Sequence, residues 1–136
     1  MAEKLTRGVH HIGLTVPDLD QARAFFCGVL GFDEVGRVPN YPSIFVSDNA
    51  VLLTLWRASD PLTARAFDRR TNIGLHHLSL AVADDAALDR LWETVSACPE
   101  VVIDSPPGPI RPGSGTRHFL VFIPGGIRLE FATPFV

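Results

Sequence analysis

The chain contains one short phrase twice. Residues 8–20 read GVHHIGLTVPDLD, and residues 74–86 read GLHHLSLAVADDA. When His11 is set on His77, the copies are 66 positions apart in a chain of 136 residues. A repeat of this kind predicts two copies of one supersecondary unit, each too small to bury a core alone.

Each copy begins with a predicted β-strand. Apolar and small or polar residues alternate, and this period of two is typical of a half-buried strand. The apolar face is formed by Ile12, Leu14 and Val16 in one copy, and by Leu78, Leu80 and Val82 in the other. His11 and His77 fall on the opposite face. His10 and His76 fall on the apolar side, and we interpret them as capping or supporting residues.

A helix and three further strands are predicted after each of these first strands. Asp18 is the expected N-cap of the first helix and Gly31 its stop signal, and Asp84 or Asp85 caps the second helix, which ends at Pro99. The strand-like runs are DEVGRV, SIFVS and AVLLTLW, then EVVID, TRHFLVFI and GIRLEFA. Each half therefore reads βαβββ. The prediction is one α+β domain over 1–136, with modules at 6–56 and 74–134 and a linker at 57–73.

Composition excludes several classes of function. The net charge is −3 and no run of Lys or Arg stands out, which argues against nucleic acid or an anionic membrane as partner. No stretch approaches the roughly 20 apolar residues that span a bilayer. Cys27 and Cys98 are expected to be buried free thiols, and no secretory signal is apparent. We therefore expect a cytoplasmic protein.

One acidic residue, Glu130, stands inside an apolar strand near the end of the chain. By period two, it shares a face with Arg128 and Ala132. A buried carboxylate without a partner costs several kcal/mol, so Glu130 needs a cation or hydrogen-bond donors. Two interpretations remain open: a salt bridge to Arg128 or another arginine, or a metal ion shared with His11 and His77.

Residues 11–32, HIGLTVPDLDQARAFFCGVLGF, and the closing GGIRLE run resemble the vicinal oxygen chelate superfamily. That group includes glyoxalase I, fosfomycin-resistance enzymes, methylmalonyl-CoA epimerase, extradiol dioxygenases and bleomycin-resistance proteins. The resemblance covers nearly the whole chain. It implies two tandem βαβββ modules that form a curled mixed sheet around a cleft, the glyoxalase-like fold.

The resemblance also implies one divalent metal ion, of Fe, Mn, Zn or Ni, held by His11, His77 and Glu130. The family's fourth position falls on Thr54, where glyoxalase I and the epimerases carry Glu or Gln. A neutral hydroxyl is a poor metal ligand, so coordination positions would stay open for substrate. We therefore expect no true glyoxalase I activity.

Counting back from Glu130 places further residues on its face. His118 is a candidate general acid or base beside Glu130, and a hydrogen-bonded strand histidine is the alternative. In the first half the same count places Ile44, Val46 and Leu52 toward the cleft. The predicted substrate-binding residues are Thr15, Thr54, Trp56, Leu120, Phe122 and Arg128.

The sequence thus predicts a divalent-metal enzyme that acts on a small, partly apolar molecule, with Glu130 and His118 as catalytic residues. Lyase, isomerase, transferase and dioxygenase chemistry stay open. Leu120 stands where extradiol dioxygenases carry tyrosine, and Gly13 where fosfomycin transferases carry threonine, so neither of those reactions is supported. The alternative is a metal-free protein that sequesters a small molecule, as bleomycin-resistance proteins do. Open sheet edges predict a homodimer.

Overall fold

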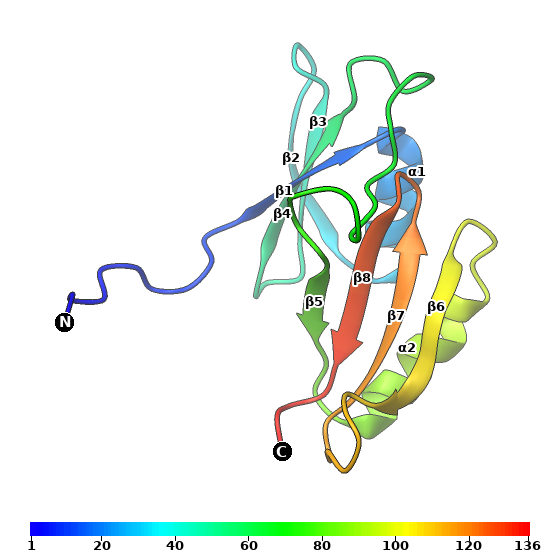
Figure 1. The fold of residues 1–136 in the computed structure, drawn as a ribbon. Coiled ribbons are helices and arrows are strands. Elements are labelled where there is room, and N and C mark those ends of the chain that lie inside the picture. Colours follow the sequence, from blue (N-terminus) through cyan, green and yellow to red (C-terminus); the bar gives the residue numbers. More distant parts are fainter. The chain divides into compact units, whose positions relative to one another are not determined.

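The computed structural model describes residues 1–136 and separates into two compact units, Met1–Ala64 and Arg65–Val136. Each unit contains one four-stranded sheet, and the elements are coloured along the chain in Figure 1. None of the helices is long and apolar enough to cross a membrane.

The first unit follows the predicted βαβββ order. Its sheet has the strand order β1-β4-β3-β2, in which β1 and β4 are parallel and the other pairs are antiparallel. The elements are β1 (Ile12–Val16), α1 (Leu19–Arg23), η1 (Ala24–Val29), β2 (Asp33–Val38), β3 (Ser43–Ser47) and β4 (Leu52–Arg57).

The second unit repeats this arrangement. The order of its sheet is β5-β8-β7-β6, again with one parallel pair, between β5 and β8. The elements are β5 (Leu78–Ala81), α2 (Asp85–Ser96), β6 (Val102–Pro109), β7 (Arg117–Ile123) and β8 (Ile127–Ala132). The predicted α+β class with two βαβββ repeats is confirmed.

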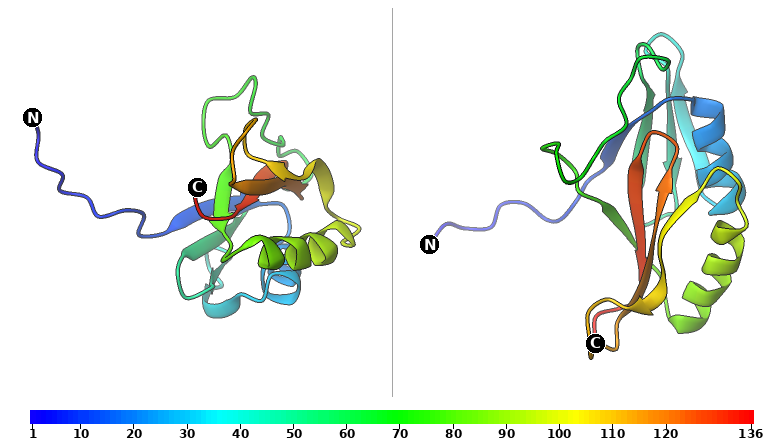
Figure 2. Two further views of the ribbon diagram at one scale, coloured as in Figure 1. Left: turned by 90° about the horizontal axis from the view of Figure 1, so that it is seen from below. Right: turned by 45° about the vertical axis from the view of Figure 1, so that its right-hand side comes forward.

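The helix of each unit covers one face of its own sheet. Helix α1 contacts β3 and β4, and α2 contacts β6 and β7, as Figure 2 shows. The core of each unit lies between helix and sheet. Its largest fully buried residues are Val16, Phe26, Ile44, Val46, Leu53 and Leu55 in the first unit, and Leu88, Val95, Phe119, Val121, Leu129 and Phe131 in the second. The other face of each sheet, here called the helix-free face, bears the remaining side chains.

Both helix caps form as predicted. Asp18 accepts a hydrogen bond from the backbone N–H of Gln21 at 2.9 Å, and Asp84 accepts one from Ala87 at 2.8 Å. Gly31 adopts φ +79°, the left-handed conformation that ends a helix at low cost for glycine. The chain is therefore turned back toward each sheet by residues that the sequence identifies.

The first helix differs from the prediction, because α1 passes into a π-helical segment, η1. There the N–H of Leu30 bonds to the carbonyl of Phe25, five residues earlier, at 3.0 Å. The wider turn shifts the helical register, so the adjacent residues Phe25 and Phe26 are both buried.

Strand β6 is also longer than the predicted run at 100–104. It continues to Pro109 through Pro106 and Pro107. Proline is tolerated because β6 is an edge strand and its pairing with β7 is interrupted by register shifts.

Cys27 and Cys98 are free, as predicted, but half-buried instead of fully buried.

Candidate functional site

Glu130 occupies the middle of β8, between its parallel neighbour β5 and its antiparallel neighbour β7. It pairs in register with Ser79 on one side and Leu120 on the other. Only 8% of Glu130 is exposed, so its carboxylate needs partners within the protein.

Two imidazoles are those partners. Oε2 of Glu130 accepts a hydrogen bond from Nδ1 of His118 at 2.6 Å, and Oε1 lies 3.6 Å from Nε2 of His77. The salt bridge to Arg128, one of the two interpretations from sequence, does not form. Arg128 instead donates from Nε and Nη2 to Oδ2 of Asp104, at 2.9 and 2.8 Å.

The charge state of Glu130 follows from these neighbours. Burial raises the pKa of Glu130, but hydrogen bonding by His118 and Ser79 and the charges of His77 and His118 lower it by more. The net pKa lies below the ordinary glutamate value. Glu130 is therefore an ionised carboxylate at neutral pH, with one oxygen directed toward each histidine.

The adjacent histidines contact each other in both copies of the repeat. Nδ1 of His76 lies 2.8 Å from Nδ1 of His77, and Nδ1 of His10 lies 2.9 Å from Nδ1 of His11. In each pair one ring must donate and the other accept. Burial, then the nearby charges of His77, Arg128 and Arg69, lowers the pKa of His76, which favours its neutral form.

In the first sheet, Thr54 stands at the position that Glu130 occupies in the second. Thr54 pairs in register with Gly13, as Glu130 pairs with Ser79. Oγ1 of Thr54 accepts a hydrogen bond from Nε1 of Trp56 at 2.8 Å. The position equivalent to Glu130 is thus filled in the first sheet by a neutral hydroxyl bound to an indole.

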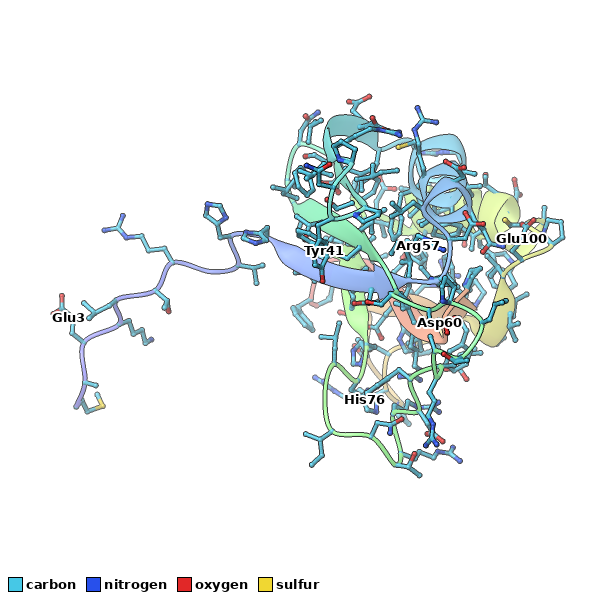
Figure 3. All side chains as sticks on the ribbon, turned by 90° about the horizontal axis from the view of Figure 1, so that it is seen from above. Glu3, Tyr41, Arg57, Asp60, His76 and Glu100 are labelled. Atoms are coloured by element: carbon cyan, nitrogen blue, oxygen red, sulfur yellow. The ribbon has the colours of Figure 1, made fainter.

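Aromatic side chains surround this hydroxyl–indole pair. The Tyr41 ring, labelled in Figure 3, lies 4.8 Å from Trp56 between centroids, and the Phe45 ring lies 6.1 Å away. Gly13, Thr15, Val38, Tyr41 and Trp56 line a hollow of about 610 Å³, which we call the aromatic hollow.

The prediction that Ile44 and Val46 lie toward the cleft is wrong. Phe45 pairs with Thr54 across β3 and β4, so Phe45 shares its face, while Ile44 and Val46 are buried under the helix. Period two alone leaves the phase of β3 undetermined until the cross-strand register is known.

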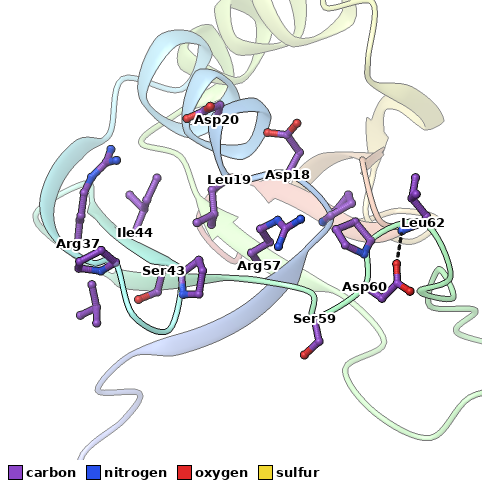
Figure 4. Close-up of a pocket in the computed structure, with 15 residues that line it drawn as sticks. Asp18, Leu19, Asp20, Arg37, Ser43, Ile44, Arg57, Ser59, Asp60 and Leu62 are labelled. Carbon is purple, nitrogen blue, oxygen red and sulfur yellow. Dashed lines mark hydrogen bonds between the residues drawn. The ribbon is translucent and has the colours of Figure 1, made fainter.

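A second hollow in the first unit, of about 690 Å³, lies between the start of α1 and the segment after β4 (Figure 4). Asp18, Leu19, Ser43 and Arg57 line it. It contains none of the predicted site residues. No histidine or glutamate lines it, so it offers no base of the Glu130–His118 kind.

The remaining predicted residues of the second sheet lie beside Glu130. Leu120 is buried and pairs with Glu130, and Phe122 pairs with Arg128. The Arg69 guanidinium lies 5.8 Å above the Phe122 ring. Sequence reasoning missed Ser79, Asp104 and Tyr41. The position of Ser79 could have been predicted, because Ser79 lies on the histidine face of the repeated strand. The position of Asp104 could not have been predicted, because the register of β6 shifts at this residue.

The donor chemistry of the second unit fits part of a metal site. His77 and Glu130 offer an imidazole nitrogen and a carboxylate oxygen from neighbouring strands, which suits Zn, Fe, Mn or Ni. No group of three His, Cys, Asp or Glu side chains that could hold an ion is formed within either unit.

Comparison with known proteins defines the class. The model of the Glyoxalase/Bleomycin resistance protein/Dioxygenase superfamily matches residues 8–131, so the chain belongs to that superfamily. This confirms the resemblance to the vicinal oxygen chelate group. Members are mostly enzymes that act on small molecules, typically bind a divalent metal ion and commonly form dimers.

The chain is also similar to individual members of this superfamily. A 2-epi-5-epi-valiolone epimerase from Actinomyces sp is 33% identical over 90% of this chain and 76% of its own length. The fosfomycin resistance protein FosX from Listeria monocytogenes has a TM-score of 0.73 at 17% identity, covering 97% of each chain. A lactoylglutathione lyase from Agrobacterium tumefaciens has a TM-score of 0.68 at 23% identity, covering 96% of each. The two structures share the fold.

Proposed function

We propose that this protein is an epimerase-type enzyme that removes and returns a proton on a carbon next to the carbonyl of a small ketone. The observation that carries the proposal is the buried Glu130–His118 pair, with 2.6 Å between Oε2 and Nδ1. The similarity to an epimerase named for a ketone supplies the reaction type.

His118 is the proposed base. With its Nδ1–H donated to Glu130, the neutral ring carries its lone pair on Nε2, which has no hydrogen-bond partner in the protein. Nε2 takes the proton of the substrate C–H bond, and the electron pair of that bond stays on the substrate as an enolate. Glu130 stabilises the imidazolium that forms, as a carboxylate does beside a catalytic histidine. Inversion is completed when a proton returns to the opposite face of the carbon from a second acid, which solvent can supply.

We propose that His11, His77 and Glu130 hold the divalent metal ion that is typical of the superfamily. The two oxygens of Glu130 support this assignment, because Oε2 binds His118 while Oε1 is directed toward His77. A bound ion would supply positive charge beside the developing enolate oxygen. His77 can bind through Nε2 only if its proton is on Nδ1, where His76 is placed to accept it.

The reaction is tested by hydrogen exchange in D₂O. The probes are 2-epi-5-epi-valiolone and the methylglyoxal–glutathione adduct, and NMR follows loss of the proton next to the carbonyl. We expect exchange of the ketone with the wild-type protein and a loss of about 10³-fold in His118→Asn. Arg117→Gln is the matched control, since Arg117 precedes His118 on β7 and pairs with Asp89 instead. Unchanged exchange in His118→Asn would contradict the assigned base.

The metal is tested by elemental analysis of protein purified without a histidine tag or added metal. We expect His77→Ala and His11→Ala to reduce bound divalent metal to near zero, and His76→Ala to retain most of it. Equal loss in His76→Ala and His77→Ala would refute the ligand assignment. A wild-type protein that binds the ketone without metal and without exchange would be the sequestering protein of the alternative prediction.

We also propose that the protein is a cytoplasmic homodimer. Strands β1, β2, β5 and β6 are sheet edges with unpaired backbone groups, and pairing of two copies is a common way to cover such edges. Sedimentation that shows only monomer at micromolar concentration would contradict the dimer.

A further inference from the structure

We propose that the aromatic hollow of the first unit binds the carbon face of a neutral, hydroxylated aliphatic ring. This inference rests on the proposed function and names the substrate class of that enzyme. Gly13, Trp56 and Tyr41 are among the residues that line the hollow. Every residue that lines the hollow belongs to the first unit.

The rings of Tyr41 and Trp56 are close together and nearly perpendicular. The Tyr41 and Trp56 rings are 4.8 Å apart between centroids, with an interplanar angle of 79°. Phe45 supports Trp56 from another side at 6.1 Å. A corner of two nearly perpendicular rings offers one flat wall and one edge, which suits a compact ring better than an extended chain. A volume of about 610 Å³ accommodates such a molecule together with solvent.

The indole N–H of Trp56 already donates a hydrogen bond within the protein. Its only donor, Nε1–H, binds Oγ1 of Thr54 at 2.8 Å, and Thr54 is itself buried. The indole is therefore fixed in orientation and can offer a ligand only its carbon surface. C–H bonds next to oxygen carry a partial positive charge and are attracted to the electron-rich face of an aromatic ring.

Glycine at position 13 leaves space beside the hydrogen bond between Thr54 and Trp56. A Cβ at this position would lie 3.2 Å from Oγ1 of Thr54 and 3.5 Å from Nε1 of Trp56. Any side chain would therefore press on the bond that fixes the indole. In the second sheet the equivalent position is Ser79, so glycine is not required by the strand itself.

The residues that line the hollow favour a ligand with hydroxyl groups over a charged ligand. The hydroxyls of Tyr41 and Thr15 make no side-chain hydrogen bond within the protein, so each can bind a substituent of the ligand. None of the residues that line the hollow is charged. The hollow therefore offers no charged partner to a phosphate or carboxylate. A neutral ring with hydroxyl groups at its edge and C–H bonds on its face matches these features.

The test uses Trp56 as its own reporter. The chain has two tryptophans, Trp56 and Trp92, and Trp92 packs on Phe119 in the second unit. In Trp92→Phe protein, Trp56 fluorescence is titrated with myo-inositol, 2-epi-5-epi-valiolone, the acyclic polyol threitol, and catechol. We expect a saturable change with the two hydroxylated rings and none with threitol. Catechol should bind more weakly than either ring.

Paired variants locate the binding. Gly13→Ala should raise the dissociation constant for myo-inositol by at least roughly tenfold, which is about 1.4 kcal/mol. Gly28→Ala is the matched control, because a Cβ there meets nothing within 4 Å. Tyr41→Ala is a second variant at an exposed position, and it should weaken binding even if Gly13→Ala fails to fold. Equal affinity in Gly13→Ala, Tyr41→Ala and the parent would overturn the proposal.

The same samples separate this inference from the proposed function. Binding should persist after metal is removed with a chelator, while proton exchange should stop. Exchange without any response of Trp56 to either ring would refute the substrate class and leave the enzyme assignment standing. Ring binding without exchange in the metal-loaded protein would refute the enzyme assignment and leave this site standing. Tighter binding of catechol than of myo-inositol would overturn the choice of an aliphatic ring.

Discussion

The two sheets have the same strand order, and β4 and β8 pair with their neighbours in equivalent register, but the helix-free faces of the sheets bear opposite chemistry. Where β1 meets β4, Gly13 lies beside Thr54, and where β5 meets β8, Ser79 lies beside Glu130. One sheet presents aromatic rings and a hydroxyl, and the other presents histidines and a carboxylate. A shared backbone therefore fixes where a functional side chain can stand without fixing which chemistry stands there.

Burial makes the contrast sharper, because Thr54 and Glu130 are each 8% exposed. The Thr54 hydroxyl is neutral, and it accepts one hydrogen bond, from Nε1 of Trp56 at 2.8 Å. A carboxylate has about four acceptor sites and a full charge, so it requires several donors. His118, His77 and Ser79 surround Glu130 for that reason.

The largest effect is expected from removing the charge of Glu130. Glu130→Gln preserves the shape of the side chain but cannot stabilise an imidazolium at His118, so proton exchange of the ketone should fall by about 10³-fold. Val35→Ala is the control in the other sheet, because Val35 is exposed on β2, and it should change exchange by less than about threefold. Glu130→Gln with more than a tenth of wild-type exchange would contradict the functional contrast between the sheets.

A pair of core variants tests the structural equivalence. Leu53 and Leu129 are fully buried one position before Thr54 and Glu130. Leu53→Ala and Leu129→Ala should each reduce the free energy of unfolding by about 2–5 kcal/mol in urea denaturation. Val35→Ala, on the exposed side of β2, should cost less than about 1 kcal/mol. A negligible effect of either leucine variant would show that the repeats do not pack alike.

Thr54→Glu makes the first sheet resemble the second. The variant removes the acceptor of the Trp56 indole and buries a carboxylate without imidazole partners, so unfolding should become easier by about 1–3 kcal/mol in metal-free protein. Added divalent metal should restore part of this loss and bind more tightly than to the wild type. Wild type and variant should both leave the methylglyoxal–glutathione adduct unchanged. Efficient wild-type isomerisation of that adduct with nickel or zinc would refute our interpretation of Thr54.

Local patterns predicted the repeat, the caps and most strands because each depends on residues close in sequence. Asp18 and Asp84 cap helices through bonds to residues three positions later, and Gly31 ends its helix by its own conformation. The alternation in β8 placed Arg128 and Glu130 on one face of that strand. These features need no knowledge of the neighbouring elements.

Features that depend on distant partners were not predictable in this way. The π-helical turn η1 is accompanied by burial of both Phe25 and Phe26, which depends on the packing of the core, and the phase of β3 follows from its pairing with β4. The partner of Arg128 is Asp104, on a bulged edge strand whose register no local pattern gives. Tyr41 reaches Trp56 from a turn, and no periodicity extends into turns.

The smallest predicted effect compares two glutamates whose pKa values are both lowered, by different means. Glu34, on the edge strand β2, binds Arg37 at 2.9 Å and Arg23 at 2.7 Å. These hydrogen bonds, Arg37 first, lower the pKa of Glu34 from 4.5 to about 2. Because the folded-state value is the lower one, this pairing stabilises the fold above pH 4.5 and is lost as the pH falls toward 2.

Salt should separate the two glutamates. NMR of the side-chain carboxyl carbons gives each titration, and 1 M NaCl should raise the pKa of Glu34, since its arginine partners are solvent-exposed and are screened. Glu130 should respond much less, because its side chain and that of its hydrogen-bond partner His118 are only 10% and 14% exposed. Arg37→Gln should move the pKa of Glu34 toward 4.5 and leave Glu130 unchanged. Equal salt responses would mean that Glu130 is as accessible to solvent ions as the edge strand, which would remove the basis for a sheltered carboxylate–imidazole pair in the second sheet.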